Sequence, residues 1–339
     1  ILSCHKVHRT IQLDPAVEDG ELLSGNLAQR TFENVHHRSP LMSRAVDQAR
    51  LFSQSEGPIL LAGPQGSEIR LIAQCIHNNS ANCTGPFVQL NCAAIEPDEQ
   101  MTTLFSTGYK NKDGEVDLGV FGMAENGTLM LQEIDKLSYT AQSNIYQAVR
   151  YHRIIQRNLE RPIHVNIRLI ATTEADLWAM ACGGGFRTDL YYLLAGLRID
   201  LPPLKKRPED LEDILQKTFR QMCENFHRYH VITNGGMQLL QSYDWPGNIL
   251  QVNSFMERLV LTAAHRTIDE NAIRRLWQQM FPSHDREEPE PLPANQSREA
   301  RRILQALARN DGNRALTARE LGISTTTLWR KIKKLGLEQ

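Results

Sequence analysis

Residues 58–77 read PILLAGPQGSEIRLIAQCIH, and the fold is decided there. A short apolar run, Ile59 to Leu61, meets a Gly-Pro-Gln-Gly turn, and a helical pattern follows with Ile72 and Ile76 on one side. Strand, glycine loop and helix in this order form the frame of a phosphate-binding loop, in which backbone N–H groups at a helix N-terminus hold an anion. Taken alone, the stretch fits an ordinary strand-to-helix turn about as well, so the neighbouring motifs decide between the two.

The chemical groups of a phosphate-binding loop are mostly missing from this frame. Gly63 is in register with the pattern G-x-x-x-x-G-K-[ST], but the second glycine is Glu68. The lysine of the pattern is Ile69 and its hydroxyl residue is Arg70. A carboxylate thus stands where a glycine would face phosphate, and an aliphatic side chain replaces a cation. The residues of this degenerate loop are Gly63, Pro64, Gln65, Gly66, Ser67, Glu68, Ile69 and Arg70.

Composition limits the classes of protein to which the chain can belong. With 339 residues it is long enough for two or three domains, and its net charge of −1 means that any affinity for nucleic acid must be local. The six cysteines form no CxxC pair and mostly lie in apolar runs, which predicts reduced, buried thiols in a cytoplasmic protein. No apolar run reaches the length of a membrane span, and no signal peptide is visible. Because the chain begins at Ile1, we expect a fragment that has lost an N-terminal sensory domain, with residues 1–30 as the connector.

Four further apolar runs have the character of buried strands. They are residues 86–92, 127–134, 167–173 and 197–201, and helical patterns separate them. Near-continuous apolar strands that alternate with helices are typical of a parallel sheet covered on both faces. The sequence therefore predicts an α/β domain around the loop.

Six blocks of sequence point to one family. They are GPFVQLNCAAI (85–95), GTLMLQEI (127–134), IRLIATTEADL (167–177), FRTDLYYLL (186–194), LPPLKKRPEDL (201–211) and WPGN (245–248). With these blocks in the family's order, residues 32–281 resemble the AAA+ domain of the bacterial enhancer-binding proteins, the NtrC class that remodels sigma-54 RNA polymerase. The resemblance implies a parallel five-stranded AAA+ sheet at residues 31–201 and a helical lid at residues 202–281.

The resemblance also implies roles for polar residues at the strand ends. The magnesium-binding Asp of the Walker B strand is Gln132 here, and a neutral amide holds a divalent cation poorly. The acid that polarises the attacking water corresponds to Glu133, and Asn91 corresponds to the switch residue that restrains it. In the sensor I strand Thr173 is kept, whereas the Asn that follows it in the family is Glu174.

Other charged groups of the family are replaced. Of the two arginines that reach a neighbouring subunit's nucleotide, Arg187 is kept and the second is Leu193, while the sensor II arginine is Leu250. The GAFTGA motif, with which the family grips sigma-54, is missing between Phe105 and Gly127. Since lysine, magnesium ligand and arginine finger each stabilise charge in phosphoryl transfer, we expect no ATP hydrolysis, no cofactor and no catalytic role for the remnants. Bound ATP with Mg is the alternative, and the carboxylate in the loop argues against it.

A proline-rich, acidic stretch at residues 282–297 predicts a linker and a domain boundary. Residues 298–339 then have the pattern of three short helices, at about 303–307, 315–321 and 325–335, with a turn at 322–324. Residues 297–339 carry ten Lys or Arg and four acidic residues, a net charge of +6 in a chain whose total charge is −1. The predicted core of this small all-α domain is Ala318, Leu321, Ile323, Leu328, Ile332 and Leu335.

A helix-turn-helix whose second helix is basic is the layout of a DNA-binding domain. The stretch GNRALTARELGISTTTLWRKIKKLGL (312–337) resembles the Fis-type domain that ends enhancer-binding proteins, and it departs from it at Thr325, where the family often has Arg. A solvated basic helical hairpin is the other reading, and agreement of turn, cap and charge disfavours it. The residues predicted to contact DNA are Ser324, Thr325, Thr326, Thr327, Arg330, Lys331, Lys334 and Arg314.

One cluster suggests a metal site. Cys223, His227 and His230 share a helical face, but structural zinc normally takes four ligands and the sequence offers no obvious fourth. We therefore expect no bound metal.

These patterns favour a sequence-specific DNA-binding transcription regulator on a degenerate, hydrolysis-incompetent AAA+ scaffold, which serves oligomerisation or signal coupling independently of sigma-54. The alternative is an ATP-dependent sigma-54 activator, and a third reading is a switch that binds nucleotide without hydrolysing it. The expected partners are a double-stranded DNA operator and further copies of the chain, in a dimer or a larger AAA+ ring, with RNA polymerase as a further candidate. We expect no membrane partner and a cytoplasmic, nucleoid-associated location.

Overall fold

The computed structural model describes residues 23–24, 28, 30–106, 117–155, 161–281, 306, 310 and 313–334. The chain divides into two compact units, residues 1–273 and 274–339. No helix within these described ranges is long and apolar enough to span a membrane.

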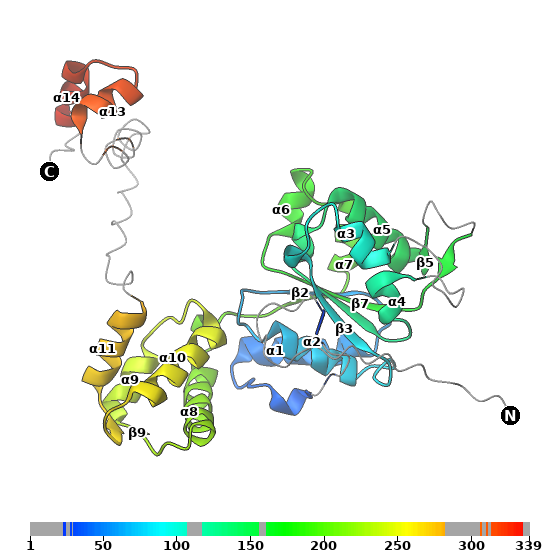
Figure 1. The fold of residues 1–339 in the computed structure, drawn as a ribbon, viewed down its shortest axis with the longest axis horizontal. Helices are drawn as coiled ribbons and strands as arrows, with labels where there is room; N and C mark the ends of the chain where they lie inside the picture. Colours follow the sequence, from blue (N-terminus) through cyan, green and yellow to red (C-terminus); the bar gives the residue numbers. More distant parts are fainter. Residues whose placement is uncertain are drawn as a thin grey trace. The chain divides into compact units, whose positions relative to one another are not determined.

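Five parallel strands form the centre of the first unit (Figure 1). They are β2 (Ile59–Ala62), β3 (Phe87–Asn91), β4 (Thr128–Gln132), β7 (Arg168–Thr173) and β8 (Arg198–Asp200). Their order across the sheet is β3-β4-β7-β2-β8, and each neighbouring pair is parallel. Each strand falls on one of the apolar runs, so the predicted parallel sheet is confirmed. Because parallel strands end at the same edge, the loops that follow β2, β3, β4 and β7 lie together.

A sixth strand was not predicted. β1 (Leu23–Ser24) pairs antiparallel with β3, with Leu23 opposite Leu90 and Ser24 opposite Gln89. β1 lies within residues 1–30, which the sequence analysis interprets as a connector. An edge strand presents unpaired backbone groups to any neighbouring segment, and the apolar periodicity of the connector is too short to reveal such pairing.

The two faces of the sheet are covered by different helices (Figure 1). Alternate residues of β2 point to opposite sides, so Leu60 belongs to one apolar cluster while Ile59 and Leu61 belong to the other. Helices α1 (Pro40–Ser53) and α2 (Ile69–Asn78) cover the Leu61 face. The opposite face is covered by α3 (Gln100–Phe105), α4 (Gly119–Met123), α5 (Tyr139–Tyr151), α6 (Leu177–Cys182) and α7 (Thr188–Ala195).

Short elements complete the sheet domain. The hairpin strands β5 (Arg153–Ile154) and β6 (Ile163–His164) pair antiparallel after α5. Single 3-10 turns precede α1, follow β3, follow β4 and lead into the lid, as η1 (Phe32–Asn34), η2 (Cys92–Ala94), η3 (Ile134–Lys136) and η4 (Leu204–Lys206).

A helical lid follows the sheet, and we use this name for α8 to α11. The helices are α8 (Pro208–Asn225), α9 (Asn234–Gln241), α10 (Asn248–Thr262) and α11 (Glu270–Met280). Strands β9 (Val231–Ile232) and β10 (Thr267–Ile268) pair parallel beside them. Trp245 is buried before α10 and donates its indole N–H to the Leu240 carbonyl over 2.9 Å, which fixes the turn of the WPGN block.

The second unit contains the predicted helix-turn-helix. Helices α13 (Arg314–Glu320) and α14 (Thr325–Lys334) lie where the sequence placed them, joined by a turn in which Gly322 has a φ of +67°. Ala318 and Leu328 are buried as predicted, whereas Leu321 and Ile323 are only half-buried. The predicted first helix lies outside the described residues except for Ala306 and Asn310, as do the linker at 282–297 and the core residue Leu335.

The prediction of buried cysteines is right only in part. Cys75 and Cys92 are buried, and burial raises the pKa of the Cys75 thiol to about 12. Cys83 and Cys182 are exposed, because each lies in a loop or helix end that covers no core. All five cysteines of the described residues are free thiols.

Candidate functional site

The degenerate loop keeps the backbone shape of its frame. Gly63 donates its N–H to the Thr173 carbonyl over 3.1 Å, which ties the loop to the end of β7. Ser67 turns back on the loop, with its N–H 3.1 Å and its hydroxyl 2.6 Å from the Pro64 carbonyl. Gly66 and Glu68 both have positive φ, of +77° and +68°. A glycine adopts this conformation without cost, whereas a residue with a Cβ is strained there, so the loop retains the shape of a sequence with glycine at position 68.

The residue at the lysine position is a half-buried isoleucine. Ile69 packs against the apolar cluster under α1 and α2. Arg70 is exposed. The loop therefore places no cation beside its own backbone amides, and Ile69 contributes packing.

Glu68 has a partner in the lid segment. Its carboxylate lies 2.9 Å from a guanidinium nitrogen of Arg207, and the Glu68 side chain is 11% exposed against 1% for Arg207. The same guanidinium donates to the Asp210 carboxylate over 3.0 Å and to the His36 carbonyl over 2.7 Å. One buried cation thus joins the loop, the start of α8 and the segment before α1.

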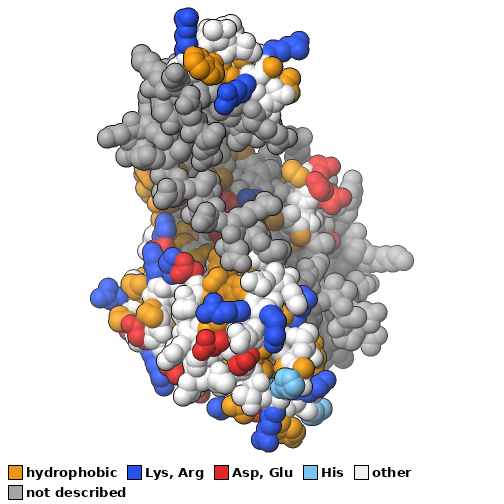
Figure 2. All heavy atoms as spheres, turned by 90° about the vertical axis from the view of Figure 1, so that its left-hand side faces the viewer, with side chains coloured by type: hydrophobic (Ala, Val, Ile, Leu, Met, Phe, Trp, Pro, Cys, Tyr) orange, Lys and Arg blue, Asp and Glu red, His pale blue; other side chains and the backbone are white. Residues whose placement is uncertain are grey.

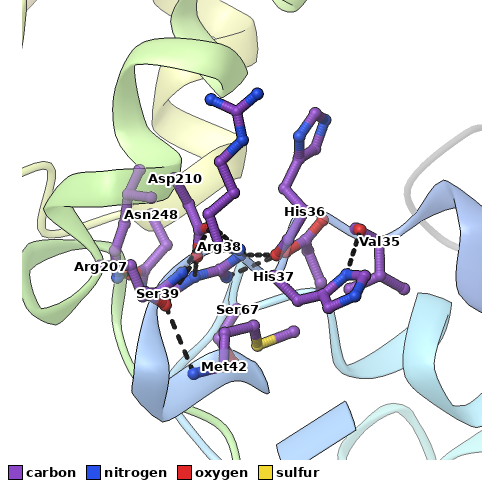
Figure 3. A network of polar contacts seen from close by, with 12 residues as sticks. Val35, His36, His37, Arg38, Ser39, Met42, Ser67, Arg207, Asp210 and Asn248 are labelled. Carbon is purple, nitrogen blue, oxygen red and sulfur yellow. Dashed lines mark hydrogen bonds and ion pairs between the residues drawn. The ribbon is translucent and has the colours of Figure 1, made fainter.

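Asp210 is the second centre of this network (Figure 3). Its carboxylate accepts the Ser39 hydroxyl over 2.7 Å and the backbone N–H groups of Arg38 and Ser39 over 2.5 and 3.1 Å. The Ser39 hydroxyl also caps α1 by accepting from the Met42 N–H over 3.3 Å. Ser39 therefore caps α1 and also anchors its N-terminus to the lid.

The two carboxyl groups beside Arg207 respond differently to their surroundings. Burial raises the pKa of Glu68 above its ordinary value, and the Arg207 pair offsets only part of that shift. Burial alone would also raise the pKa of Asp210, but hydrogen bonds from Ser39 and Arg207 outweigh it and hold the pKa below its ordinary value.

The lid also contacts the loop through backbone groups. The Asn248 amide donates to the Gln65 carbonyl over 2.8 Å and accepts the Leu204 N–H over 2.7 Å. The Ile249 N–H donates to the Gly66 carbonyl over 3.2 Å. The lid backbone lies so close that a Cβ on Gly66 would come within 2.6 Å of the Gly247 carbonyl oxygen. The first turn of α10 is thus seated directly on the loop.

The retained polar residues at the strand ends make local contacts. The Asn91 amide oxygen accepts from the Ala93 N–H over 2.9 Å and so caps η2. The Gln132 amide reaches the Gln89 amide over 3.5 Å, and the Glu133 N–H donates to the Thr172 hydroxyl over 3.3 Å.

Thr173 and Arg187 also have partners in their own subunit. The Thr173 hydroxyl donates to Asp135 over 2.7 Å. Arg187 makes a bidentate ion pair with Asp189, at 3.0 and 2.7 Å, and its guanidinium lies 5.1 Å from the ring centre of Tyr139. The hydrogen bonds from Arg187 are the largest cause that lowers the pKa of Asp189.

Two residues that replace family arginines differ in their surroundings. Leu193 packs against the apolar cluster under α5 and α7, and Leu250 is 52% exposed at the start of α10. Neither position supplies a positive charge near the loop.

The residues proposed for DNA contact form an exposed surface. Ser324, Thr325, Thr326, Thr327, Arg330 and Arg314 are exposed and Lys331 is half-exposed, while the Lys334 side chain lies outside the described residues. The Ser324 hydroxyl caps α14 by accepting from the Thr327 N–H over 3.1 Å. On the face in Figure 2, the charged side chains in view on this unit are those of Lys and Arg.

The histidine and cysteine cluster is a weak metal candidate. Cys223, His227 and His230 line a cavity of about 760 Å³ on the lid, and the His230 Nδ1 contacts the His265 carbonyl over 3.0 Å. Within the ranges that the structure describes, no three His, Cys, Asp or Glu side chains converge closely enough to hold a metal ion.

Three known families match consecutive parts of the chain. The Sigma-54 interaction domain matches residues 35–200, the AAA+ ATPase lid domain residues 205–290, and the bacterial regulatory protein Fis family residues 297–335. Transcriptional regulatory protein ZraR from Escherichia coli is 33% identical over 307 residues, which cover 88% of this chain and 68% of that protein. The chain belongs to the bacterial enhancer-binding regulators.

Two further similarities add detail to this membership. A Geobacillus stearothermophilus protein named limonene hydroxylase is 33% identical over 326 residues, which cover 89% of this chain but only 56% of that protein. The crystal structure of NtrX from Brucella abortus in complex with ADP superimposes with a TM-score of 0.65 at 25% identity, over 90% of this chain and 70% of that one. The chain therefore spans little more than half the length of some of the enhancer-binding regulators and relatives that it matches.

Sequence reasoning missed the residues that hold this regulator's loop to its lid. Arg207, Asp210 and Asn248 were not singled out, although all three lie in quoted blocks. The signal available was an Arg and an Asp three residues apart in a segment that leads into a helix. Such a pair is buried only if further partners satisfy both charges, and those partners are distant in sequence.

Asp210→Asn should reduce the acid sensitivity of this regulator's fold. Because the pKa of Asp210 is lowered in the folded chain, its carboxylate stabilises the fold at neutral pH, and this stabilisation is lost as pH falls from about 4 through the lowered pKa. We expect a loss of about 3 kcal/mol in unfolding free energy near neutral pH, as for other broken buried ion pairs, and a weaker pH dependence in acid. Urea titrations across this pH range measure both.

Asp244→Asn is the matched control, since Asp244 pairs with Lys205 on the lid surface with both side chains more than 60% exposed. It should change the unfolding free energy by less than about 1 kcal/mol. If the unfolding free energies of the wild type and Asp210→Asn change in parallel with pH, Asp210 does not cause the acid sensitivity of the fold.

Proposed function

We propose that this chain is a sequence-specific DNA-binding transcription regulator whose AAA+ domain does not hydrolyse ATP and serves oligomerisation or signal coupling, independently of sigma-54. The observation that carries the DNA-binding part is the exposed polar and basic surface at the start of α14. Ser324 to Thr327 are exposed there while Leu328, on the other side of the helix, is buried. A helix packed on one side by its own domain and bearing hydroxyl and basic groups on the other is suited to the major groove.

The residues at the loop do not fit a bound magnesium nucleotide. A phosphate chain needs backbone amides together with a cation, and here Glu68 places a carboxylate at the loop while Ile69 packs into the apolar cluster. Gln132 offers an amide where a carboxylate would hold magnesium. NtrX was crystallised with ADP. The loop of this chain differs from a nucleotide-binding site at Glu68, Ile69 and Gln132. We therefore derive no step through a nucleotide.

The alternative is an ATP-dependent sigma-54 activator, and one observation favours it. Glu133, Asn91, Thr173 and Arg187 stand at the strand ends and helix start where the family's catalytic residues stand. ATPase activity is typical of this family, and a switch that binds nucleotide without hydrolysis is the intermediate case. Against both, the retained groups contact partners in their own subunit, as the Arg187–Asp189 pair shows.

The remaining parts of the proposal follow the domain pattern. We propose a connector at 1–30, the sheet domain at 31–201, the lid at 202–281, a linker at 282–297 and the DNA-binding domain at 298–339. The partners are operator DNA and further copies of the chain, with RNA polymerase as a further partner, and the location is the bacterial cytoplasm at the nucleoid. We propose no second function from the name of the Geobacillus relative. Its match covers 89% of this chain and therefore includes most of the sheet domain, the lid and the DNA-binding domain.

DNA recognition is tested by two kinds of variant in the full chain. Thr326→Ala should change the preferred operator sequence, with a discrimination of about 1–3 kcal/mol lost for a base contact. Lys331→Ala should weaken binding to all sequences and reduce the salt dependence by about one phosphate contact. Thr327 is the poorer target, because its N–H and hydroxyl contact the capping Ser324. Operator titrations at several salt concentrations measure both effects.

Lys205→Ala is the charge-matched control on the lid surface and should leave operator binding unchanged. If the threonine variant keeps the wild-type preference and Lys331→Ala keeps the full salt slope, α14 is not the recognition helix.

ATP turnover tests the degenerate site. The purified chain should show no magnesium-dependent hydrolysis above background, because Ile69, Gln132, Leu193 and Leu250 replace charge-handling groups, and a finger arginine alone is worth about 10³–10⁵ in rate. Turnover that Glu133→Gln abolishes would contradict this proposal and support the alternative.

Independence from sigma-54 is tested in a reconstituted transcription assay. The segment between Phe105 and Gly127 lacks the motif that grips sigma-54, although residues 107–116 lie outside the described structure. We expect no open complexes at sigma-54 promoters with this protein and ATP. Open complexes that require both would establish the activator reading.

A further inference from the structure

Two hydrogen bonds and one ion pair join the loop directly to the lid. Three consecutive parts of the loop are held: the Gln65 carbonyl by the Asn248 amide, the Gly66 carbonyl by the Ile249 N–H, and the Glu68 carboxylate by Arg207. Each of these contacts joins residues more than 130 positions apart in the chain. The lid therefore reaches the loop by direct contact along its length.

Arg207 is the only charged group among these three lid contacts, and its burial makes an anion necessary. It is 1% exposed, so its positive charge must be balanced inside the protein. Asp210, on the same helix, supplies one carboxylate through the guanidinium Nε. Glu68 supplies the second through a terminal nitrogen, and it alone links the cation to the loop.

The backbone at Glu68 supports the same conclusion. A Glu in the left-handed region is strained, and glycine would relieve that strain. The strain persists because the ion pair and the packing of Ile69 hold the segment.

We propose that the Glu68 carboxylate is an internal anion that occupies the place of a nucleotide phosphate at this loop and fixes the lid to the sheet domain through Arg207. A diphosphate brought to the loop would meet this carboxylate at close range, where like charges repel strongly in a partly buried setting. It would also have to separate the Glu68 carboxylate from Arg207, which would then keep only Asp210 as its carboxylate partner. The lid is consequently held in one position that nucleotide does not control.

This inference deepens the proposed function, because it rests on the absence of nucleotide chemistry and adds the group that replaces it. It can fail on its own. ATP hydrolysis by the wild type would contradict the proposed function. If the wild type shows no turnover and the lid contact is unchanged when Glu68 is substituted, only this inference is contradicted.

Hydrogen exchange on the full chain measures the lid contact directly. Glu68→Ala removes one carboxylate acceptor of Arg207, so we expect exchange at the Ile249 amide, which is bonded across the contact to the Gly66 carbonyl, to rise by about tenfold or more. Glu68→Gln keeps an acceptor oxygen at the same reach, so exchange at the Ile249 amide should be nearly that of the wild type. Asp244→Asn breaks an exposed ion pair on the lid and should not change exchange at the Ile249 amide.

Nucleotide binding measures the displacement. Wild-type protein should show no saturable binding of Mg·ADP in calorimetry, while Glu68→Gly with Ile69→Lys should gain saturable binding at least about tenfold tighter than any wild-type signal. If amide hydrogen exchange in Glu68→Ala equals that of the wild type, Glu68 does not fix the lid through Arg207. Saturable Mg·ADP binding by the wild type, or no gain in the double variant, would overturn the displacement of phosphate by Glu68.

Discussion

A buried guanidinium must be surrounded by anions and carbonyl oxygens, and this requirement joins the parts of this regulator. Arg207 contacts the loop through Glu68, α8 through Asp210 and the segment before α1 through the His36 carbonyl. Asp210 in turn holds the N-terminus of α1 through Ser39. Removing Arg207 would leave two largely buried carboxylates without their cation, which costs far more than breaking an exposed ion pair. This network, together with the contacts of Asn248 and Ile249 to the loop, fixes the relative position of lid and sheet domain.

The same network includes a loop that keeps the family frame while its sequence lacks the usual second glycine and lysine. The loop between β2 and α2 keeps its positive-φ positions, and the sheet keeps its parallel order. Groups that would meet phosphate now serve packing and ion pairing, as Ile69 does in the apolar cluster and Glu68 does at Arg207. The core around β2, β4 and β7 depends on this backbone.

Local pattern predicted the elements but not the contacts between distant ones. The five parallel strands and the helices α13 and α14 lie where apolar periodicity and turn residues placed them. The Glu68–Arg207 pair joins positions 139 residues apart, and no periodicity or spacing encodes such a contact. β1 was missed for a similar reason, because two residues of edge pairing leave no pattern. The sequence alone shows that Ile69 replaces the loop lysine. That the Ile69 side chain packs into the apolar cluster is known only from the structure.

Sedimentation velocity of the operator complex tests whether this regulator acts on DNA without nucleotide control. The full chain would be mixed with a DNA site selected from a random pool, and its sedimentation measured with and without Mg·ATP. The account predicts the same sedimentation coefficient and the same operator affinity in both conditions. A larger assembly or tighter operator binding that appears only with Mg·ATP would contradict it.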